Sequence, residues 1–531
     1  MKKNLFYIIL FFFCISSRYN TVFAQFKPVK NDCWWYDDRG QPINSQGGGI
    51  FRFPEPGTGK LKYYWYGVHY YEADSFRMDP VRIYEKANFR AVTCYSSTDL
   101  VNWKKENDVF TDAVAFPNEK PTWVGRLGVA YIRELDLYAM FVQHGREVLV
   151  ATSKTATGNF IWHRKINMTD RIGTSNTGDQ TVFTDEQSGI SYLVYSYGRG
   201  RNKIYISEIG VRNGQIDLLD CTKIFEGESR EGNCMFRYNG KYYMYASNIY
   251  GWDGSLAYYL VADNVRGPYL PANEMLVTKG SEADYAHVSQ TGFFVNVKGT
   301  KQETVIFCGD RWAEYAGNGI GYNVWVPLSF KGAEPWFNSL SAWSLNAQTG
   351  EWNTGPENNY VRNGSFEADR KYIPSRFKPV QTALTGWTNE VISGNKISLD
   401  SLTSPLLNHN NSAADRKTVT GERSLCITDQ INFERKVTQR ISSDDFVKLK
   451  DGNYVLEAWV MNSKGFTRLE MFVVSNGKRY HYSISQAIEG WTRIRLENIA
   501  VKTGDIEIGF YAKGEPGAFC YVDDVELRVR Q

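Results

Sequence analysis

The chain consists largely of short runs in which hydrophobic and polar residues alternate, bounded by Gly, Asn and Asp, and helical periodicity is nearly absent. This pattern predicts β-strands joined by tight turns. The turn signal is strong at Asn239-Gly240, which separates two such runs. Five aromatic-rich runs recur at intervals of roughly 50 residues or more, which is typical of propeller blades. They are Tyr-Tyr-Trp-Tyr-Gly at 63–67, Tyr-Ala-Met-Phe-Val at 138–142, Tyr-Leu-Val-Tyr-Ser at 192–196, Tyr-Tyr-Met-Tyr-Ala at 242–246 and Val-Ile-Phe-Cys-Gly at 305–309.

Polar residues open the third, fourth and fifth of these units: Asp179, Glu231 and Gln290. Because the first strand of each propeller blade lines the central funnel, we expect these three side chains to converge. Two carboxyls and an amide at the mouth of an aromatic-lined funnel indicate a sugar-cleaving site. Each has a structural alternative: a turn after Gly178 for Asp179, a salt bridge with Arg230 for Glu231, and an amide tying two strands together for Gln290.

Composition places the chain among globular proteins of more than one domain, since 531 residues exceed a single core and 42% of them are hydrophobic. Aromatic residues reach 15%, and most of them are expected in β-sheet cores, with a minority available to stack on sugars. A net charge of +3 gives no case for nucleic acid or an anionic membrane. The eight cysteines form no zinc motif and no dense disulfide framework, although one or two bridges are compatible with an oxidising compartment.

The N-terminus has the basic, apolar and small-residue parts of a secretory signal peptide at residues 1–24. Cleavage after Ala24 is expected, which predicts a secreted or periplasmic protein. Cys14 lies inside the apolar run without small residues just before it, which disfavours a lipid anchor. No later segment reaches the ~18 apolar residues that indicate a membrane span.

A polar, turn-rich break near residues 354–359 separates the five units from a second β-rich region. This region opens with Asn-Gly-Ser-Phe-Glu at 363–367 and closes with an Asp-Asp-Val strand at 523–525. It resembles the jelly-roll carbohydrate-binding modules attached to many polysaccharide hydrolases. In such sandwiches the opening Glu and the closing Asp often hold a structural calcium, a cation that prefers oxygen ligands. The resemblance makes Glu367 and Asp524 candidate metal ligands, with ordinary surface carboxylates as the alternative.

The Ser-Ser-Thr-Asp-Leu-Val-Asn-Trp string at 96–103 resembles the end of a first blade in glycoside hydrolase family 43, a family of five-bladed propeller enzymes. Four further segments are similar to the exo-β-1,3-galactanase-like branch of that family. They are Gly-Gly-Gly-Ile at 47–50 with Tyr-Trp-Tyr-Gly at 64–67, residues 178–185, residues 230–236, and Ser289-Gln290 with residues 309–312 and 324–328. The resemblance spans about residues 30 to 350, and the order of the segments makes it specific.

The resemblance implies an inverting glycosidase, which needs an acid for the leaving oxygen and a base for the attacking water. Glu231 matches the general acid, and Asp179 matches the carboxylate that raises the pKa of that acid. The first-blade Asp that most members use as base is missing here, as it is in the galactanase branch. Gln290 matches the fifth-blade Gln that this branch is thought to use, positioning water or acting through a relay.

This chain departs from the branch in residues that would hold the sugar. Val68-His69 stands where the branch has Glu, Arg126 lies where it has Glu-Arg-Pro-Lys, and Gln46 replaces a His. Loss of two buried acceptors predicts a changed glycone preference. The candidate substrate-binding residues are Gln46, His69, Arg126, Tyr250, Trp252, Asp310, Arg311 and Trp312. Blade packing, surface ion pairs and loop positions are their structural alternatives.

The prediction is therefore an all-β protein, with a five-bladed β-propeller at 26–355 followed by a jelly-roll β-sandwich at 360–531. The expected activity is hydrolysis of terminal galactosyl or arabinosyl-type residues in a plant polysaccharide such as arabinogalactan. The alternatives are a furanosidase of other specificity and a propeller that binds glycan without turnover. No organic cofactor is implied, and the expected partner is a polysaccharide or oligosaccharide, with no nucleic acid. A structural calcium, or a calcium or sodium ion on the propeller axis, is compatible with the family.

Overall fold

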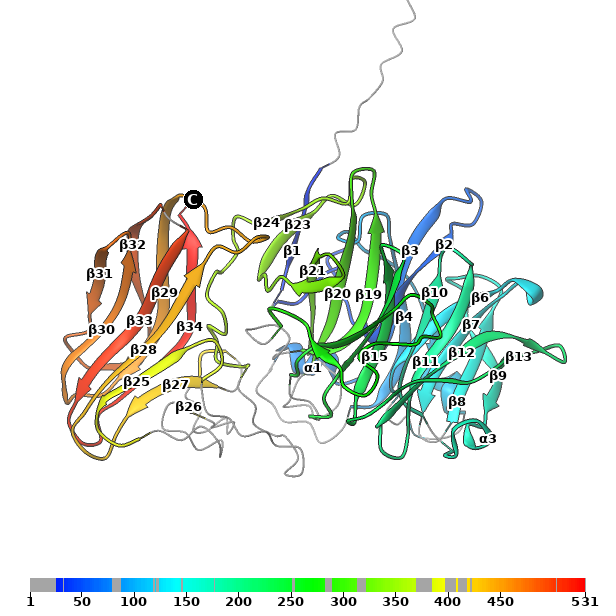
Figure 1. The fold of residues 1–531 in the computed structure, drawn as a ribbon, viewed down its shortest axis with the longest axis horizontal. Coiled ribbons are helices and arrows are strands. Elements are labelled where there is room, and N and C mark those ends of the chain that lie inside the picture. Colours follow the sequence, from blue (N-terminus) through cyan, green and yellow to red (C-terminus); the bar gives the residue numbers. More distant parts are fainter. Residues whose placement is uncertain are drawn as a thin grey trace, which may run out of the picture.

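A computed structural model describes residues 25–31, 33–78, 87–117, 120, 124–144, 147–175, 177–250, 254–281, 289–312, 321–368, 384–396, 407–408, 418–420, 423–502 and 504–530. The predicted signal peptide at 1–24 lies outside this described part. Strands dominate, and they form two groups of sheets that lie side by side (Figure 1). The predicted fold class is confirmed: a β-propeller is followed by a β-sandwich.

Five antiparallel sheets, each made from one continuous segment of chain, form the blades. The first is β2 (Gln46–Pro54), β3 (Leu61–Tyr70), β4 (Phe89–Ser97) and β5 (Lys104–Thr111), and the second is β6 (Leu127–Ile132), β7 (Leu137–His144), β8 (Glu147–Ser153) and β9 (Ile161–Ile166). The third is β10 (Thr177–Asp185), β11 (Ile190–Tyr197), β12 (Lys203–Arg212), β13 (Gln215–Leu218) and β14 (Thr222–Glu226). The fourth is β15 (Glu231–Tyr238), β16 (Lys241–Ser247), β17 (Tyr258–Ala262) and β18 (Leu276–Val277), and the fifth is β19 (Gln290–Lys298), β20 (Glu303–Trp312), β21 (Gly321–Lys331) and β22 (Glu334–Phe337).

Local turn chemistry explains why these segments fold into hairpins. Asn239 and Gly240 have φ angles of 47° and 79°, and they form the two-residue turn that pairs Tyr238 with Lys241. A two-residue turn with φ > 0 at both positions matches the twist of the strands it joins. The hairpin predicted from the sequence is therefore confirmed. The described helical segments are short: α1 (Ala73–Met78), α2 (Asp112–Ala115), η1 (Arg133–Leu135) and α3 (Thr169–Ile172).

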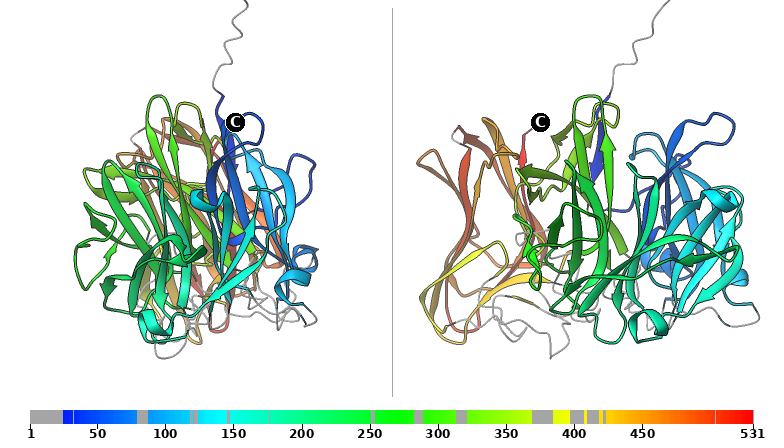
Figure 2. Two further views of the ribbon diagram at one scale, coloured as in Figure 1. Left: turned by 90° about the vertical axis from the view of Figure 1, so that its right-hand side faces the viewer. Right: turned by 45° about the vertical axis from the view of Figure 1, so that its right-hand side comes forward.

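The first strands of the blades surround the propeller axis, since β2, β6, β10, β15 and β19 contact one another in that order and β19 returns to β2. Figure 2 shows the propeller, coloured blue to green, from two further sides. The ring closes where the fifth blade contacts the first, and we call this contact the seam. No stretch of chain links these two blades directly, so side chains hold the seam together. A cluster of buried tryptophans fills it: Trp65 and Trp103 of the first blade pack against Trp325 of the fifth, with ring centroids 5.1 and 6.0 Å apart. Beside the seam, β1 (Lys27–Lys30) pairs with β23 (Ala342–Leu345), which also pairs with β24 (Trp352–Thr354).

The C-terminal region is a sandwich of two five-stranded sheets around its own hydrophobic core. One sheet has the order β25-β28-β33-β30-β31 and the other β26-β27-β34-β29-β32. The strands are β25 (Thr388–Ser393), β26 (Leu407–Asn408), β27 (Ser424–Thr428), β28 (Phe433–Ser442), β29 (Gly452–Asn462), β30 (Phe466–Ser475), β31 (Lys478–Ser483), β32 (Ile488–Val501), β33 (Asp505–Gly514) and β34 (Phe519–Val529). The predicted domain boundary, between 355 and 360, falls between β24 and β25.

Two further features bear on the sequence predictions. Seven cysteines lie in the described residues, five of them buried, and none of the seven forms a disulfide. The described helices are all too short or too polar to cross a membrane.

Candidate active site

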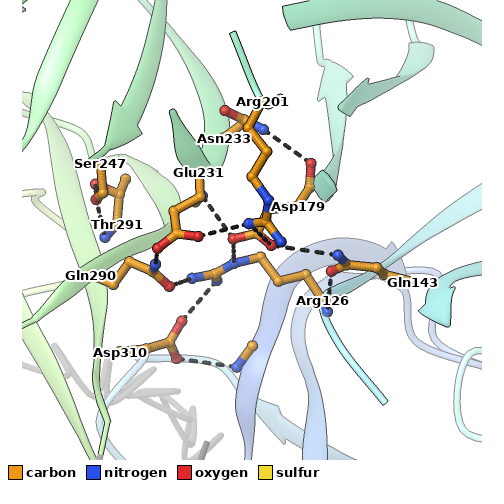
Figure 3. Close-up of polar contacts among 12 residues, drawn as sticks. Arg126, Gln143, Asp179, Arg201, Glu231, Asn233, Ser247, Gln290, Thr291 and Asp310 are labelled. Carbon is orange, nitrogen blue, oxygen red and sulfur yellow. Dashed lines mark hydrogen bonds and ion pairs between the residues drawn. The ribbon is translucent and has the colours of Figure 1, made fainter. Parts of the chain in front are cut away.

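The innermost strands begin at one end of the propeller axis, and they bring Asp179, Glu231 and Gln290 together there (Figure 3). Asp179 is the third residue of β10, and Glu231 and Gln290 are the first residues of β15 and β19. Arg126 precedes β6 directly and reaches the same point. All four side chains are buried, with 4–9% of each residue exposed. The convergence expected from the strand pattern is therefore present.

Irregular pairing at the start of the strands aims these side chains at one another. Four of the five innermost strands carry a register shift within their first few residues, among them those at Thr177/Gln180 in β10 and Glu231/Cys234 in β15. A bulge bends its strand and redirects the side chains beside it, and such bulges are frequent next to active sites. In β15 the bulge includes Gly232 at φ 64°, where a Cβ atom would lie 2.4 Å from the carbonyl oxygen of Thr291. Only glycine fits this position without displacing β19.

Arg126 is the hub of the cluster. Its guanidinium donates three hydrogen bonds in three directions: Nε to Asp179 Oδ2 at 3.1 Å, Nη1 to Asp310 Oδ2 at 2.8 Å, and Nη2 to Gln290 Oε1 at 2.6 Å. The planar fork of an arginine fixes its partners in a plane, so one side chain sets the geometry of three others from blades three and five. Asp310 also accepts from the Gly47 N–H at 3.1 Å, which connects the fifth blade to the first.

Arg201 lies between the two carboxylates that the sequence singled out. Its Nη1 donates to Glu231 Oε2 at 2.7 Å and to Asp179 Oδ1 at 3.3 Å. About a third of the Arg201 side chain, 32%, is exposed, so it is the most open member of the cluster. Its other guanidinium nitrogens donate to no described residue and are available to a ligand.

The pKa values of the two carboxyls are displaced in opposite directions. Burial raises the pKa of Glu231, the negative charge of Asp179 raises it further, and it reaches about 8 although Arg201, Arg126 and the Gln290 amide oppose the rise. Burial also acts on Asp179, but Arg201 and Arg126 and the Gly232 N–H at 2.8 Å outweigh it and hold the pKa of Asp179 below its usual value. Two neighbouring carboxyls with separated pKa values form a pair in which one carries a proton near neutral pH and the other is ionised.

The hydrogen bonds at Glu231 restrict where its proton can reside. Oε1 accepts from Gln290 Nε2 at 2.6 Å, and Oε2 accepts from Arg201. The Gln290 amide is oriented by Arg126, which occupies its oxygen, so Nε2 must face Glu231. A protonated Glu231 would carry its hydrogen on Oε2, where it faces another donor, the Arg201 N–H. Proton loading therefore requires Arg201 to move away from Oε2.

Comparison with known proteins identifies the propeller. The model of glycosyl hydrolases family 43 matches residues 73–320. Those residues are a family 43 glycosyl hydrolase domain. The family supports assignment of the chain as a glycoside hydrolase with a carbohydrate substrate. No curated protein matches the chain by sequence.

Solved structures agree with the fold. An exo-β-1,3-galactanase from Phanerochaete chrysosporium with galactose is 20% identical, with a TM-score of 0.52 over 93% of this chain and 100% of that chain. A variant of this galactanase with one Glu→Gln substitution, bound to β-1,3-galactotriose, is 19% identical, with a TM-score of 0.52 over 94% of this chain and 99% of that chain. An exo-β-1,3-galactanase from Clostridium thermocellum is 21% identical, with a TM-score of 0.52 over 80% and 93%. At this identity the likeness establishes the shared architecture.

The predicted substrate-binding residues of the family 43 domain divide into two groups. Arg126 and Asp310 belong to the cluster, and Gln46 is buried at the start of β2, next to Gly47. Asp310 is 1% exposed and both of its oxygens accept hydrogen bonds, so its contacts position Arg126. Arg311 is the next residue of β20, and strand alternation directs it to the opposite face.

His69 is not part of the cluster. It is buried on β3, and neither ring nitrogen has a hydrogen-bond partner among the described residues. Burial lowers the pKa of His69 to about 4, Arg90 adds to the effect, and Asp108 and Asp74 oppose it. Tyr250 is half-buried in the loop after β16.

Two predicted wall residues cannot be placed. Trp252 lies outside the described residues, and the side chain of Trp312, at the end of β20, is not described.

Sequence reasoning missed Arg201, Gln143 and the backbone of Gly232. Gln143 accepts from the Arg126 N–H at 3.1 Å and contacts Asp179 Oδ1 at 3.5 Å. The signal for Arg201 was present: antiparallel pairing puts the end of β11 beside the start of β10, so the turn that follows β11 belongs to the same end of the axis as Asp179.

The predicted calcium ligands lie in the sandwich. Glu367 forms an ion pair with Arg423, Oε2 to Nη1 at 3.3 Å, and Asp524 accepts from the Thr420 hydroxyl at 2.7 Å. Among the described residues no group of three or more His, Cys, Asp or Glu side chains is arranged around a metal position. Asp523, beside Asp524, is fully buried, and burial together with the charges of Asp524 and Glu367 holds its pKa well above the usual value. A cation would relieve this excess of negative charge, so the chemistry of these carboxylates suits calcium. For Glu367 to bind the cation, its ion pair with Arg423 would have to break.

Proposed function

We propose that the family 43 domain hydrolyses a terminal galactosyl or arabinosyl-type linkage of a plant polysaccharide such as arabinogalactan, with inversion at the anomeric carbon. The observation that carries this proposal is the carboxyl pair: Glu231 with a pKa of about 8 beside an Asp179 whose pKa is lowered. A carboxyl that keeps its proton at neutral pH is what protonation of a leaving glycosidic oxygen needs. The galactose and β-1,3-galactotriose in the solved galactanases support a galactosyl glycone.

Glu231 is the general acid in this proposal. The negative charge of Asp179 raises the pKa of Glu231 through like-charge repulsion, so Glu231 keeps its proton. The glycosidic oxygen takes the position that Arg201 Nη1 occupies at Glu231 Oε2. The Oε2 proton passes to that oxygen as its bond to the anomeric carbon breaks. Water adds to the anomeric carbon from the opposite face and loses a proton, which gives the inverted sugar.

Gln290 is assigned a positioning role toward the acid and toward the attacking water. Its amide nitrogen holds Glu231 Oε1, and its oxygen is held by Arg126. For Gln290 to reach the water, the bound sugar must separate its amide from Glu231, since acid and water lie on opposite faces of an inverted sugar. An amide is a poor base, so the water proton is expected to leave through a relay.

A second candidate function is glycan binding without turnover. The observation that favours it concerns the general base, which an inverting glycosidase needs. The described carboxylates of the cluster are the acid Glu231, its modulator Asp179, and Asp310, whose two oxygens both accept hydrogen bonds already. Export through the predicted signal peptide and a structural calcium in the sandwich complete the proposal, and both suit an enzyme that meets plant polysaccharide outside the cell.

The test compares the wild type, Glu231→Gln and Glu228→Gln on arabinogalactan, arabinan and β-1,3-galactobiose, with NMR of the released anomeric protons. Glu228 is three residues upstream and its side chain is 80% exposed, so it controls for charge loss nearby. The expected result is an inverted monosaccharide from wild type and Glu228→Gln, and a loss of 100-fold or more, on the order of general-acid contributions, in Glu231→Gln. Equal release by all three proteins would refute the assignment of Glu231. Retained glycan binding with no release from any of them would favour the binding protein.

A further inference from the structure

A cavity of about 680 Å³ opens at the end of the propeller axis away from the catalytic cluster. The innermost strands that begin at the cluster end in its walls, for example β15 with Glu231 at one end and Arg237 at the other. Six residues at about 3.3 Å each separate these two positions by about 20 Å along the strand. The cavity is lined by neither Asp179, Glu231 nor Gln290, so it is distinct from the candidate active site.

Aromatic rings form much of its wall. Phe51, Phe183 and Phe294, from three different blades, each keep 8–9% exposure, whereas Phe141 in a blade core has none. These three residues therefore keep a small part of their surface open where they line the cavity. At its mouth Tyr131 is 41% exposed, and its ring lies 5.1 Å from that of Tyr138. An aromatic ring held this open on a rigid strand is a platform for the apolar face of a sugar ring.

Polar groups lie between the rings. Glu186 joins Arg52 at 3.2 Å and Lys298 at 2.9 Å, and all three side chains are partly exposed. The Arg237 Nε is buried and has no hydrogen-bond partner among the described residues. Asn296 donates to Glu303 at 2.8 Å. Carboxylates with spare acceptor capacity and guanidinium groups with spare donors match sugar hydroxyls, each of which donates and accepts.

We propose that this cavity is a second carbohydrate-binding site, which holds an oligosaccharide segment of the polysaccharide whose chain end is cleaved at the opposite end of the axis. The cavity volume falls within the 300–1,000 Å³ that is usual for ligand sites, and its mixture of aromatic and hydrogen-bonding walls suits an amphipathic sugar. The choice of a glycan as ligand rests on the proposed function. A chain held at the second site raises the concentration of chain ends near Glu231 without adding a contact at the active site.

The experiment measures arabinogalactan and arabinan binding by calorimetry in a Glu231→Gln background, with and without Tyr131→Ala. Tyr36→Ala is the matched control, because Tyr36 is 54% exposed and does not line the cavity. Lys298→Gln, at a 48% exposed side chain, is a second cavity variant. We expect about 10-fold weaker polysaccharide binding from Tyr131→Ala, the size of a lost aromatic contact, a smaller loss from Lys298→Gln and none from Tyr36→Ala.

Turnover separates this inference from the proposed function. With Glu231 intact, Tyr131→Ala should raise KM for the polysaccharide and leave kcat/KM for β-1,3-galactobiose unchanged. Weaker binding in the cavity variants together with no hydrolysis by wild type would support the second site and reject the hydrolase. Normal hydrolysis with polysaccharide binding equal in all variants, or absent from all, would overturn the second site and leave the hydrolase standing.

Discussion

Replacement of Arg201 by Met should move the basic limb of the pH–activity profile to higher pH. Arg201 Nη1 lies 2.7 Å from Glu231 Oε2 and 3.3 Å from Asp179 Oδ1, so its charge favours the ionised form of both carboxyls. In the proposed mechanism Glu231 must be protonated to act, so activity should be lost as pH rises through its pKa, which is about 8 with Arg201 present. Removal of the positive charge favours the protonated form, which raises this pKa further.

The size of the shift follows from the contact and its exposure. An opposite charge within about 4–6 Å displaces a carboxyl pKa by roughly 1–3 units. Because 32% of the Arg201 side chain is exposed, solvent screening places the effect at the lower end, about 1 unit. A shift of about 1 unit corresponds to about 1.4 kcal/mol between the two protonation states.

The assay is kcat/KM for β-1,3-galactobiose from pH 5 to 10, because this parameter reports the pKa values of the free enzyme. Arg199→Met is the control, since Arg199 is exposed in the same turn and contacts neither carboxyl in the structure. The control should keep the wild-type limb. A basic limb that stays in place, or moves to lower pH, in Arg201→Met would show that Arg201 does not act on the acid.

Three further predictions concern stability. Gly232→Ala should lower the free energy of unfolding by more than the about 1–2 kcal/mol cost of a left-handed backbone, because the new Cβ meets the Thr291 carbonyl. Gly240→Ala is the control: with φ 79° and no atom within 4 Å of the new Cβ, it should cost only the backbone part. Urea unfolding compares the two variants, and equal losses of unfolding free energy would contradict the clash. Because the pKa of His69 falls from 6.5 unfolded to about 4 folded, the unfolded chain binds the extra proton, so stability should drop by up to about 3 kcal/mol as pH falls from 6.5 to 4. His69→Gln should flatten this part of the curve of unfolding free energy against pH, and an unchanged slope would argue against it. Calcium should raise Tm relative to EDTA, and Asp523→Asn should remove the difference; an identical Tm with and without calcium in the wild type would count against the metal proposal.

The sequence identified those parts of the fold and the cluster that depend on local signals. Asn239-Gly240 predicts its hairpin because φ > 0 at two successive positions is a property of those residues alone. Asp179, Glu231 and Gln290 were found because each lies within the first three residues of an innermost strand.

Arg201 was missed because its place depends on the pairing of Thr177 with Tyr197, a register that only the folded sheet defines. The hub role of Arg126 depends on three partners that lie 53 to 184 residues away in the sequence. His69 lies in β3, and the side of the sheet that it faces depends on the same kind of long-range register. The local sequence pattern therefore placed His69 at the sugar, whereas the folded chain buries it outside the cluster.

The seam makes the candidate active site the last part of the propeller to be completed during synthesis. The Asp310–Gly47 hydrogen bond and the tryptophans around Trp65 join chain segments that are made at opposite ends of the domain. The fifth blade must therefore be synthesised before Arg126 can bind Gln290 and Asp310, and the tryptophan face of the first blade stays uncovered until then. In the closed ring, the tryptophans and the Asp310 contact that orients Arg126 lie in the same seam. A shift in the wavelength of tryptophan fluorescence on heating should therefore coincide with disruption of the candidate active site.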